Sequence, residues 1–194
     1  MRLLFITGFP YLPQRFGGAE RSIDCLARAL KSQGHHVGVY AGLYNGGWTG
    51  YVTRLRRKIL SQRPPKTLYN GYVVYRTWHQ AQLLPQALTD LRPDAAVLQS
   101  GKPLQFAQTI LDQGTPLILH LRDAEFSKLG GDPRDYPFCL VIANSHYIAS
   151  AFYNQFGIDS VTIRNIVDPE DYFTSNRPKY VTFINPTDLK GKEL

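Results

Sequence analysis

The sequence predicts a three-layer α/β domain in which helices cover both faces of a mostly parallel β-sheet. Short apolar runs typical of buried strands alternate along the chain with stretches that have helical periodicity. Such alternation is typical of parallel strands joined by crossover helices. The chain has 194 residues, of which 43% are hydrophobic, and this is sufficient for one domain with a substantial core.

Local signals define the elements of the first half. Residues 2–6 are continuously apolar, as in a strand buried on both faces. Residues 19–33 have apolar side chains at helical spacing, and Gly34 is expected to end that helix. Asn70-Gly71 between β-rich flanks is the strongest short signal for a hairpin. The expected elements are a strand at 2–6, a helix at 19–33, a strand at 36–41, a long loop or short helix at 42–66 and a hairpin at 67–76.

The second half repeats this alternation. Pro93, Gly114 and Gly157 stand at the expected ends of three helices, and Ser145 stands at a natural N-cap. The expected elements are helices at 80–91, 103–113 and 146–156, and strands at 94–100, 116–120, 138–145 and 160–165. Ligands bind beyond the carboxyl ends of parallel strands. These ends are expected at residues 7–18, 42–50, 100–103, 120–126 and 144–146.

The carboxyl-terminal part of the sequence differs from the rest. A polar, proline-containing segment at 168–180 precedes another strand-like run at 180–186, and no helix follows that run. We therefore expect residues 1–175 to form one domain, and residues 176–194 to be a linker and the truncated start of a second domain.

The net charge of +7 is concentrated in one region. No Asp or Glu occurs between Cys25 and Thr89, whereas nine Lys and Arg residues do. Part of this stretch is a basic cluster interleaved with Leu and Ile, which could lie on an anionic membrane surface or form a solvated loop. We do not expect nucleic acid as a partner, because no aromatic stacking platform accompanies the cluster. The cluster comprises Arg54, Arg56, Arg57 and Lys58.

The sequence lacks several other functional signals. No apolar run approaches the length of about 18 residues that a transmembrane helix needs, and no signal peptide is recognisable. Cys25 and Cys139 match no metal or redox spacing, so we expect no metal site and two small buried residues in a reducing compartment. We expect a cytoplasmic protein, with peripheral attachment to the inner face of the membrane as an alternative.

Two stretches are candidates for a site. In "RFGGAERS" (15–22) two glycines precede a helix, and the amino terminus of a helix favours an anion. Its spacing fits neither a dinucleotide fingerprint nor a P-loop, so a plain turn and an anion site both stay open. His120 ends the run "PLILH" at the carboxyl edge, and Arg122, Asp123 and Glu125 follow it. This position favours a role for His120 in a site that binds a hydroxylated or charged substrate.

These stretches together resemble the amino-terminal half of family-4 retaining glycosyltransferases, which have the GT-B fold. The resemblance is carried by "LLFITGFPYLPQRFGGAERSIDCLARALKSQGHHVGVYA", "LYNGYVVYR", "PLILHLRD", "VIANSHYIASAFYNQFGIDSVTIRNIVDPEDYF" and "YVTFINPTDLKGKEL". It implies two Rossmann-like domains, with the acceptor on the first domain and the nucleotide sugar mainly on the second.

The resemblance also implies roles for individual residues. Gly17, Gly18 and Lys190 would bind the nucleotide-sugar donor, and His120 would be the catalytic residue at the transferred sugar. We assign contacts with a sugar or lipid-linked acceptor to Glu20, Arg21, Arg122 and Asp123. The implied reaction is sugar transfer with retention, with the nucleotide sugar as co-substrate and no cofactor, and the 194 residues alone are expected to be inactive.

Two alternatives stay open. One is a non-catalytic module that binds an anionic surface through the basic cluster. The other is half of a sugar-nucleotide epimerase, which shares the two-domain fold.

Overall fold

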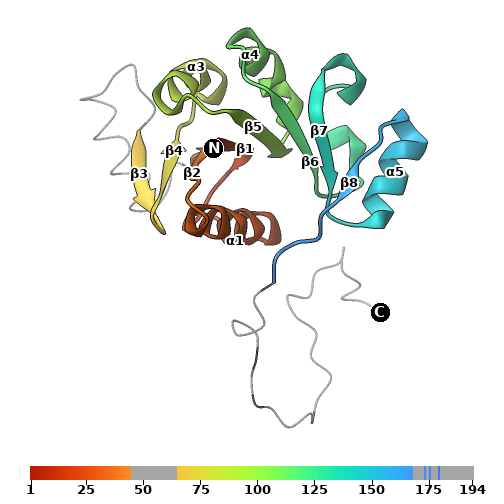
Figure 1. The fold of residues 1–194 in the computed structure, drawn as a ribbon, viewed down its shortest axis with the longest axis horizontal. Helices are drawn as coiled ribbons and strands as arrows, with labels where there is room; N and C mark the ends of the chain where they lie inside the picture. Colours follow the sequence, from red (N-terminus) through yellow and green to blue (C-terminus); the bar gives the residue numbers. More distant parts are fainter. Residues whose placement is uncertain (45–64, 168–172, 174, 176–178, 180–194) are drawn as a thin grey trace.

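The computed structural model describes residues 1–44, 65–167, 173, 175 and 179. These residues build an eight-stranded sheet with the strand order β3-β4-β2-β1-β5-β6-β7-β8. Neighbouring strands are parallel except for the antiparallel pair of β3 and β4 (Figure 1). The predicted Rossmann-like α/β fold with a small hairpin is therefore confirmed.

The elements have the following bounds. The strands are β1 (Arg2–Pro10), β2 (His36–Gly42), β3 (Lys66–Tyr69), β4 (Tyr72–Arg76), β5 (Ala95–Ser100), β6 (Leu117–Leu121), β7 (Phe138–Ala143) and β8 (Val161–Thr162). The α-helices are α1 (Gly18–Ser32), α3 (Gln80–Leu91), α4 (Ala107–Asp112) and α5 (His146–Phe156), and the 3-10 turns are η1 (Pro103–Phe106), η2 (Phe126–Lys128) and η3 (Pro133–Asp135). Within the described ranges, no helix has the length and apolar character required to span a membrane.

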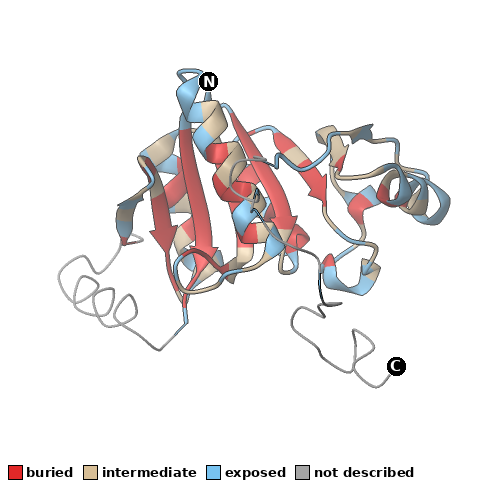
Figure 2. Ribbon diagram, turned by 90° about the horizontal axis from the view of Figure 1, so that it is seen from below, coloured by how far each residue is buried: buried red, intermediate tan, exposed pale blue. Residues whose placement is uncertain are grey.

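The two faces of the sheet are covered by different helices. On one face, Ile23 and Ala27 of α1 share an apolar cluster with Phe5 of β1. On the other face, α3, α4 and α5 contribute to a larger cluster that includes Leu98 and Leu119. Figure 1 shows α1 below the sheet and α3 and α4 above it, and Figure 2 shows the central strands as the most buried elements. This is the expected three-layer arrangement.

The predicted turn and helix signals are confirmed by the backbone. Asn70 and Gly71 have φ values of 44° and 82°, so both adopt the left-handed conformation that a tight hairpin turn requires. The hydroxyl of Ser145 accepts a hydrogen bond of 3.3 Å from the amide of Ile148 at the start of α5. Gly157 ends that helix with φ of 68°.

Several predicted bounds were wrong. β1 continues to Pro10 instead of ending at residue 6, because the chain pairs with Gly42 of β2 after an irregularity that begins at Thr7. The helix predicted over 103–113 is divided into η1 and α4. The strand predicted over 160–165 is limited to Val161–Thr162, the two residues that pair with β7. The strand predicted at 180–186 lies outside the described residues.

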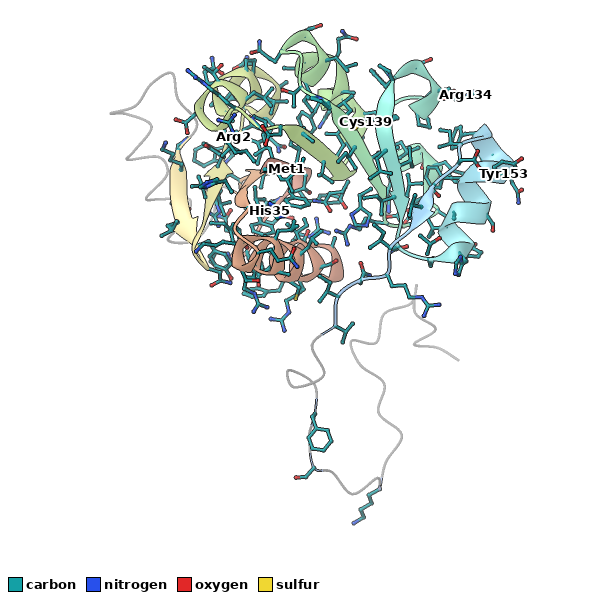
Figure 3. All side chains as sticks on the ribbon, viewed as in Figure 1. Met1, Arg2, His35, Arg134, Cys139 and Tyr153 are labelled. Atoms are coloured by element: carbon teal, nitrogen blue, oxygen red, sulfur yellow. The ribbon has the colours of Figure 1, made fainter. Side chains whose placement is uncertain are left out.

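Different contacts lie at the amino and carboxyl edges of the sheet. At the amino edge, the amino group of Met1 lies 3.3 Å from Nδ1 of His35 (Figure 3). At the carboxyl edge, Gly101 has φ of +71°, and a Cβ there would lie 2.9 Å from the Cα of Gly8. Only glycine fits this approach of the two chain segments. The contact brings the ends of β1 and β5 together beside the end of β6.

Candidate functional site

A small cavity opens at the carboxyl edge, next to the ends of β5 and β6. Its volume is about 30 Å³, and its lining includes Phe9, Gln99, Ser100, His120 and Arg122. This volume holds one or two water molecules, or one polar group of a ligand. We call this cavity, with Gln99, His120 and Arg122 on its wall, the His120 pocket.

The strand register places Gln99 and His120 side by side. Leu98 of β5 pairs with Leu119 of β6. Because side chains alternate along a strand, the next residues, Gln99 and His120, face the other side of the sheet, where α1 packs. Two positions before Gln99 and His120, Val97 and Ile118 pack in the apolar cluster beneath α1. This face therefore changes from apolar to polar just before the strands end.

His120 is buried in the pocket, with 5% of its surface exposed. Neither Nδ1 nor Nε2 has a hydrogen-bond partner among the described residues. Burial, followed by the positive charge of Arg122, lowers the pKa of His120 to about 3. The imidazole is therefore neutral near pH 7, with one N–H donor and one acceptor nitrogen. β6 extends through Leu121, so His120 is its last residue but one and does not end the strand as predicted.

Arg122 connects three parts of the domain. Its Nε and one terminal nitrogen donate to Oε1 of Gln99 at 3.1 and 2.6 Å. Its other terminal nitrogen donates to Oγ of Ser22 at 2.6 Å and to Oδ1 of Asn165 at 3.1 Å. Burial lowers the pKa of Arg122 to about 10, while the charge of Glu20 acts in the opposite direction. The guanidinium is therefore held in one orientation beside His120.

The amino terminus of α1 carries a carboxylate from its own first turn. Glu20 is buried, and its Oε2 lies where a side chain on Gly17 would collide with it. Its Oε1 lies 3.4 Å from Nε of Arg15, and Arg15 stacks on the ring of Phe9 at 3.9 Å. A negative charge at this position is favoured by the helix dipole. The predicted donor contacts of Gly17 and Gly18, which begin the helix, stay predictions.

The remaining predicted site residues divide into two groups. Arg21 and Asp123 are exposed, and Oδ1 of Asp123 accepts a hydrogen bond of 3.0 Å from the amide of Glu125. The predicted donor-binding Lys190 and the basic cluster lie outside the described residues. The cluster consists of Arg54, Arg56, Arg57 and Lys58.

Part of the positive charge in the acid-free stretch is compensated within the fold. Arg28 pairs with Asp24 at 3.2 Å, and Lys66 pairs with Asp90 at 2.8 Å. Arg76 is buried and donates hydrogen bonds to Oγ1 of Thr67 and to the backbone oxygen of Leu12. The predicted anionic-surface contact therefore depends on the basic cluster itself.

Metal ligands do not gather in the part of the chain that the structure describes. No group of three or more His, Cys, Asp or Glu side chains there could hold a metal ion. Cys25 and Cys139 are free thiols, and the prediction that both are buried was wrong, because Cys25 is half-buried and Cys139 is exposed.

Sequence reasoning missed Gln99, Ser22 and Asn165. Gln99 has a local signal, because it is a polar residue that directly follows the apolar run "AAVL" near the carboxyl end of β5. Ser22 and Asn165 have none, since each meets Arg122 only through the fold. The three residues lie on α1, on β5 and after β8.

The comparison with known families agrees with this fold. The sequence model of Glycosyltransferase Family 4 matches residues 16–171. The chain belongs to glycosyltransferase family 4. The matched region includes Gly17 and Gly18 before α1, together with His120 and Asn165. Membership in family 4 implies a nucleotide-sugar donor and an acceptor as partners. A search of curated proteins found no match.

Proposed function

We propose that residues 1–175 are the acceptor-side domain of a family-4 glycosyltransferase that transfers a sugar from a nucleotide sugar with retention of configuration. The observation that carries this proposal is the neutral, buried His120, whose two ring nitrogens have no partner among the described residues. Buried polar groups usually have partners, and an exception calls for an explanation such as a ligand.

The proposed role of His120 is to contact the transferred sugar. A neutral imidazole donates one hydrogen bond and accepts another, which suits a sugar hydroxyl. Negative charge develops on the diphosphate as it leaves, and Lys190 with the amides near Gly17 and Gly18 would stabilise it electrostatically. Arg21 and Asp123 are exposed near this edge and are proposed to contact the acceptor.

The acceptor is proposed to be a sugar or a lipid-linked molecule. Family-4 enzymes hold the nucleotide sugar mainly on their second domain, and we propose that residues 176–194 lead into that domain. The isolated 194 residues would then bind an acceptor but transfer no sugar.

The test is an assay of sugar transfer by the full-length gene product and, separately, by residues 1–194. Both are incubated with UDP-, GDP- and ADP-hexoses and with simple glycosides and membrane lipid extract as acceptors. We expect transfer by the full-length product only, and NMR of the new glycosidic bond should show the anomeric configuration of the donor. Inversion would contradict the mechanism, and transfer by residues 1–194 would contradict the division between domains.

A further inference from the structure

We propose that Gln99 is a ligand-binding residue of the His120 pocket, whose side-chain N–H donates a hydrogen bond to a sugar hydroxyl. Arg122 is the positioning residue that fixes the orientation of this carboxamide. The identity of the ligand as a sugar rests on the proposed function, whereas the direction of the N–H rests on the hydrogen bonds alone.

The oxygen of the Gln99 carboxamide is already used. Oε1 accepts two hydrogen bonds from Arg122, at 3.1 and 2.6 Å. Rotating the amide by half a turn would place its NH2 group against the donors of the guanidinium. Because donors repel donors, Arg122 holds the amide in one orientation, with Nε2 directed away from the guanidinium.

The nitrogen of the same carboxamide, in contrast, has no hydrogen-bond acceptor among the described residues. Nε2 is buried and has no hydrogen-bond partner among the described residues, and Gln99 as a whole is 5% exposed. Gln99 and His120 both line this cavity. A buried donor without an acceptor is unfavourable, so an oxygen atom of a ligand in the pocket would be bound there.

Arg122 is itself committed to the protein. The bonds to Gln99, Ser22 and Asn165 use four of the five N–H donors of its guanidinium. Its backbone oxygen accepts a hydrogen bond of 2.9 Å from Asn144. Arg122 therefore acts on a ligand through Gln99 instead of clamping an anion.

The donors that remain favour a hydroxyl over a phosphate. The pocket offers an amide N–H from Gln99 and a neutral imidazole from His120, and Glu20 adds a buried negative charge near Arg122. A phosphate needs positive charge or several donors, whereas a hydroxyl can accept from Gln99 and exchange a hydrogen bond with His120.

The first experiment observes the Gln99 side chain directly. Residues 1–194 are labelled with 15N, and the side-chain amide signals of Gln99 are assigned by their loss in Gln99→Leu. The labelled protein is titrated with methyl α-glucoside, methyl α-mannoside and, separately, inorganic phosphate. We expect at least one glycoside to shift the Gln99 amide signals and phosphate to leave them in place.

The second experiment uses the full-length gene product in the transfer assay. Gln99→Leu and Gln99→Glu both remove the N–H donor, and Glu keeps the partner of Arg122. Both should raise KM about tenfold, the loss of one neutral hydrogen bond. Arg122→Lys keeps the charge but not the paired donors, and should broaden or divide the Gln99 amide signals. Gln155→Leu, at an exposed glutamine of α5, is the matched control and should change neither readout.

The outcomes distinguish this inference from the proposed function. Two outcomes would overturn the inference and leave the function in place. One is a protein that transfers sugar but whose Gln99 amide signals are shifted by no glycoside, and the other is an unchanged KM in both Gln99 variants. A shift caused by phosphate alone would overturn the sugar as the ligand. Gln99 signals that a glycoside shifts, in a protein without transfer activity, would support the binding role and contradict the function.

Discussion

Two polar clusters are buried on the α1 face of the sheet, and they differ in how their hydrogen bonds are satisfied. One, the Asp24 network, joins α1 to the hairpin: Oδ1 of Asp24 accepts bonds from Tyr72 at 2.7 Å and Asn70 at 2.9 Å. The hydroxyls of Tyr72 and Tyr11 are 2.8 Å apart. The other, the His120 pocket, contains three buried atoms with no partner among the described residues, namely Nε2 of Gln99 and both ring nitrogens of His120.

The difference separates a network that we expect to stabilise the domain from groups that we propose to bind a ligand. Burial raises the pKa of the Tyr72 hydroxyl, and its hydrogen bonds to Tyr11 and Asp24 act in the same direction. Tyr72 therefore remains a neutral donor to Asp24. Burial lowers the pKa of His120, and no hydrogen bond from the described residues compensates for it. The first cluster should matter for folding, and the second for binding and transfer.

The largest expected effect is on the pH dependence of stability. The pKa of His120 is about 3 in the folded chain and near 6.5 when unfolded. Between these values the unfolded chain binds a proton that the pocket excludes, so the unfolding free energy decreases as pH falls, by up to about 1.4 kcal/mol per pH unit. Above pH 6.5 His120 contributes no pH dependence. Urea unfolding of residues 1–194 and of His120→Gln across this range isolates the effect, and parallel curves would contradict a neutral buried imidazole.

The next effect is on catalysis. His120→Ala should lower kcat of the full-length gene product about 10²-fold, because a contact made in the transition state is lost. The unfolding free energy should change less than in Asp24→Ala, since the deleted nitrogens have no partners among the described residues. His36→Ala, at an exposed histidine of β2, is the control. Unchanged kcat in His120→Ala would remove His120 from the site.

The third effect is on folding. Asp24→Ala should lower the unfolding free energy by about 2–3 kcal/mol, because Tyr72 and Asn70 lose their acceptor beneath α1. The transfer rate per folded molecule should be retained. Asp112→Ala removes an exposed carboxylate that accepts from Gln108, and should cost under about 0.5 kcal/mol. Equal losses in the two variants would show that the Asp24 network does not stabilise the domain.

The smallest effect concerns one hydroxyl. Tyr72→Phe should lower the unfolding free energy by about 1–2 kcal/mol, since Tyr11 and Asp24 each lose one bond while the ring still packs. Tyr147→Phe, at a tyrosine that is 73% exposed, should change it by less than about 0.5 kcal/mol. Thermal or urea unfolding of both variants makes the comparison, and a loss of transfer activity in Tyr72→Phe would place the network in the site.

The sequence by itself determined the elements whose signals are local. Apolar runs predicted the strands, the pair Asn70-Gly71 predicted the hairpin turn, and Ser145 predicted the start of α5. The position of His120 at the carboxyl edge was also accessible, because the order of strand and helix fixes the direction of each strand in a parallel sheet. The predicted end of the first strand at residue 6 and the predicted bounds of the helix at 103–113 and the strand at 160–165 were wrong. Pairing with a neighbouring strand and packing of a turn decide where these elements end.

Only the tertiary structure decided which polar groups have partners. Arg122 meets Ser22 across 100 positions of the chain and Asn165 across 43, and no local pattern encodes these contacts. The register between β5 and β6 places Gln99 beside His120, and the bonds from Arg122 to Gln99 leave one amide nitrogen directed away from the guanidinium. Residue type sets what a side chain can donate or accept, but burial and pairing depend on which strands are neighbours, and that is a property of the folded chain.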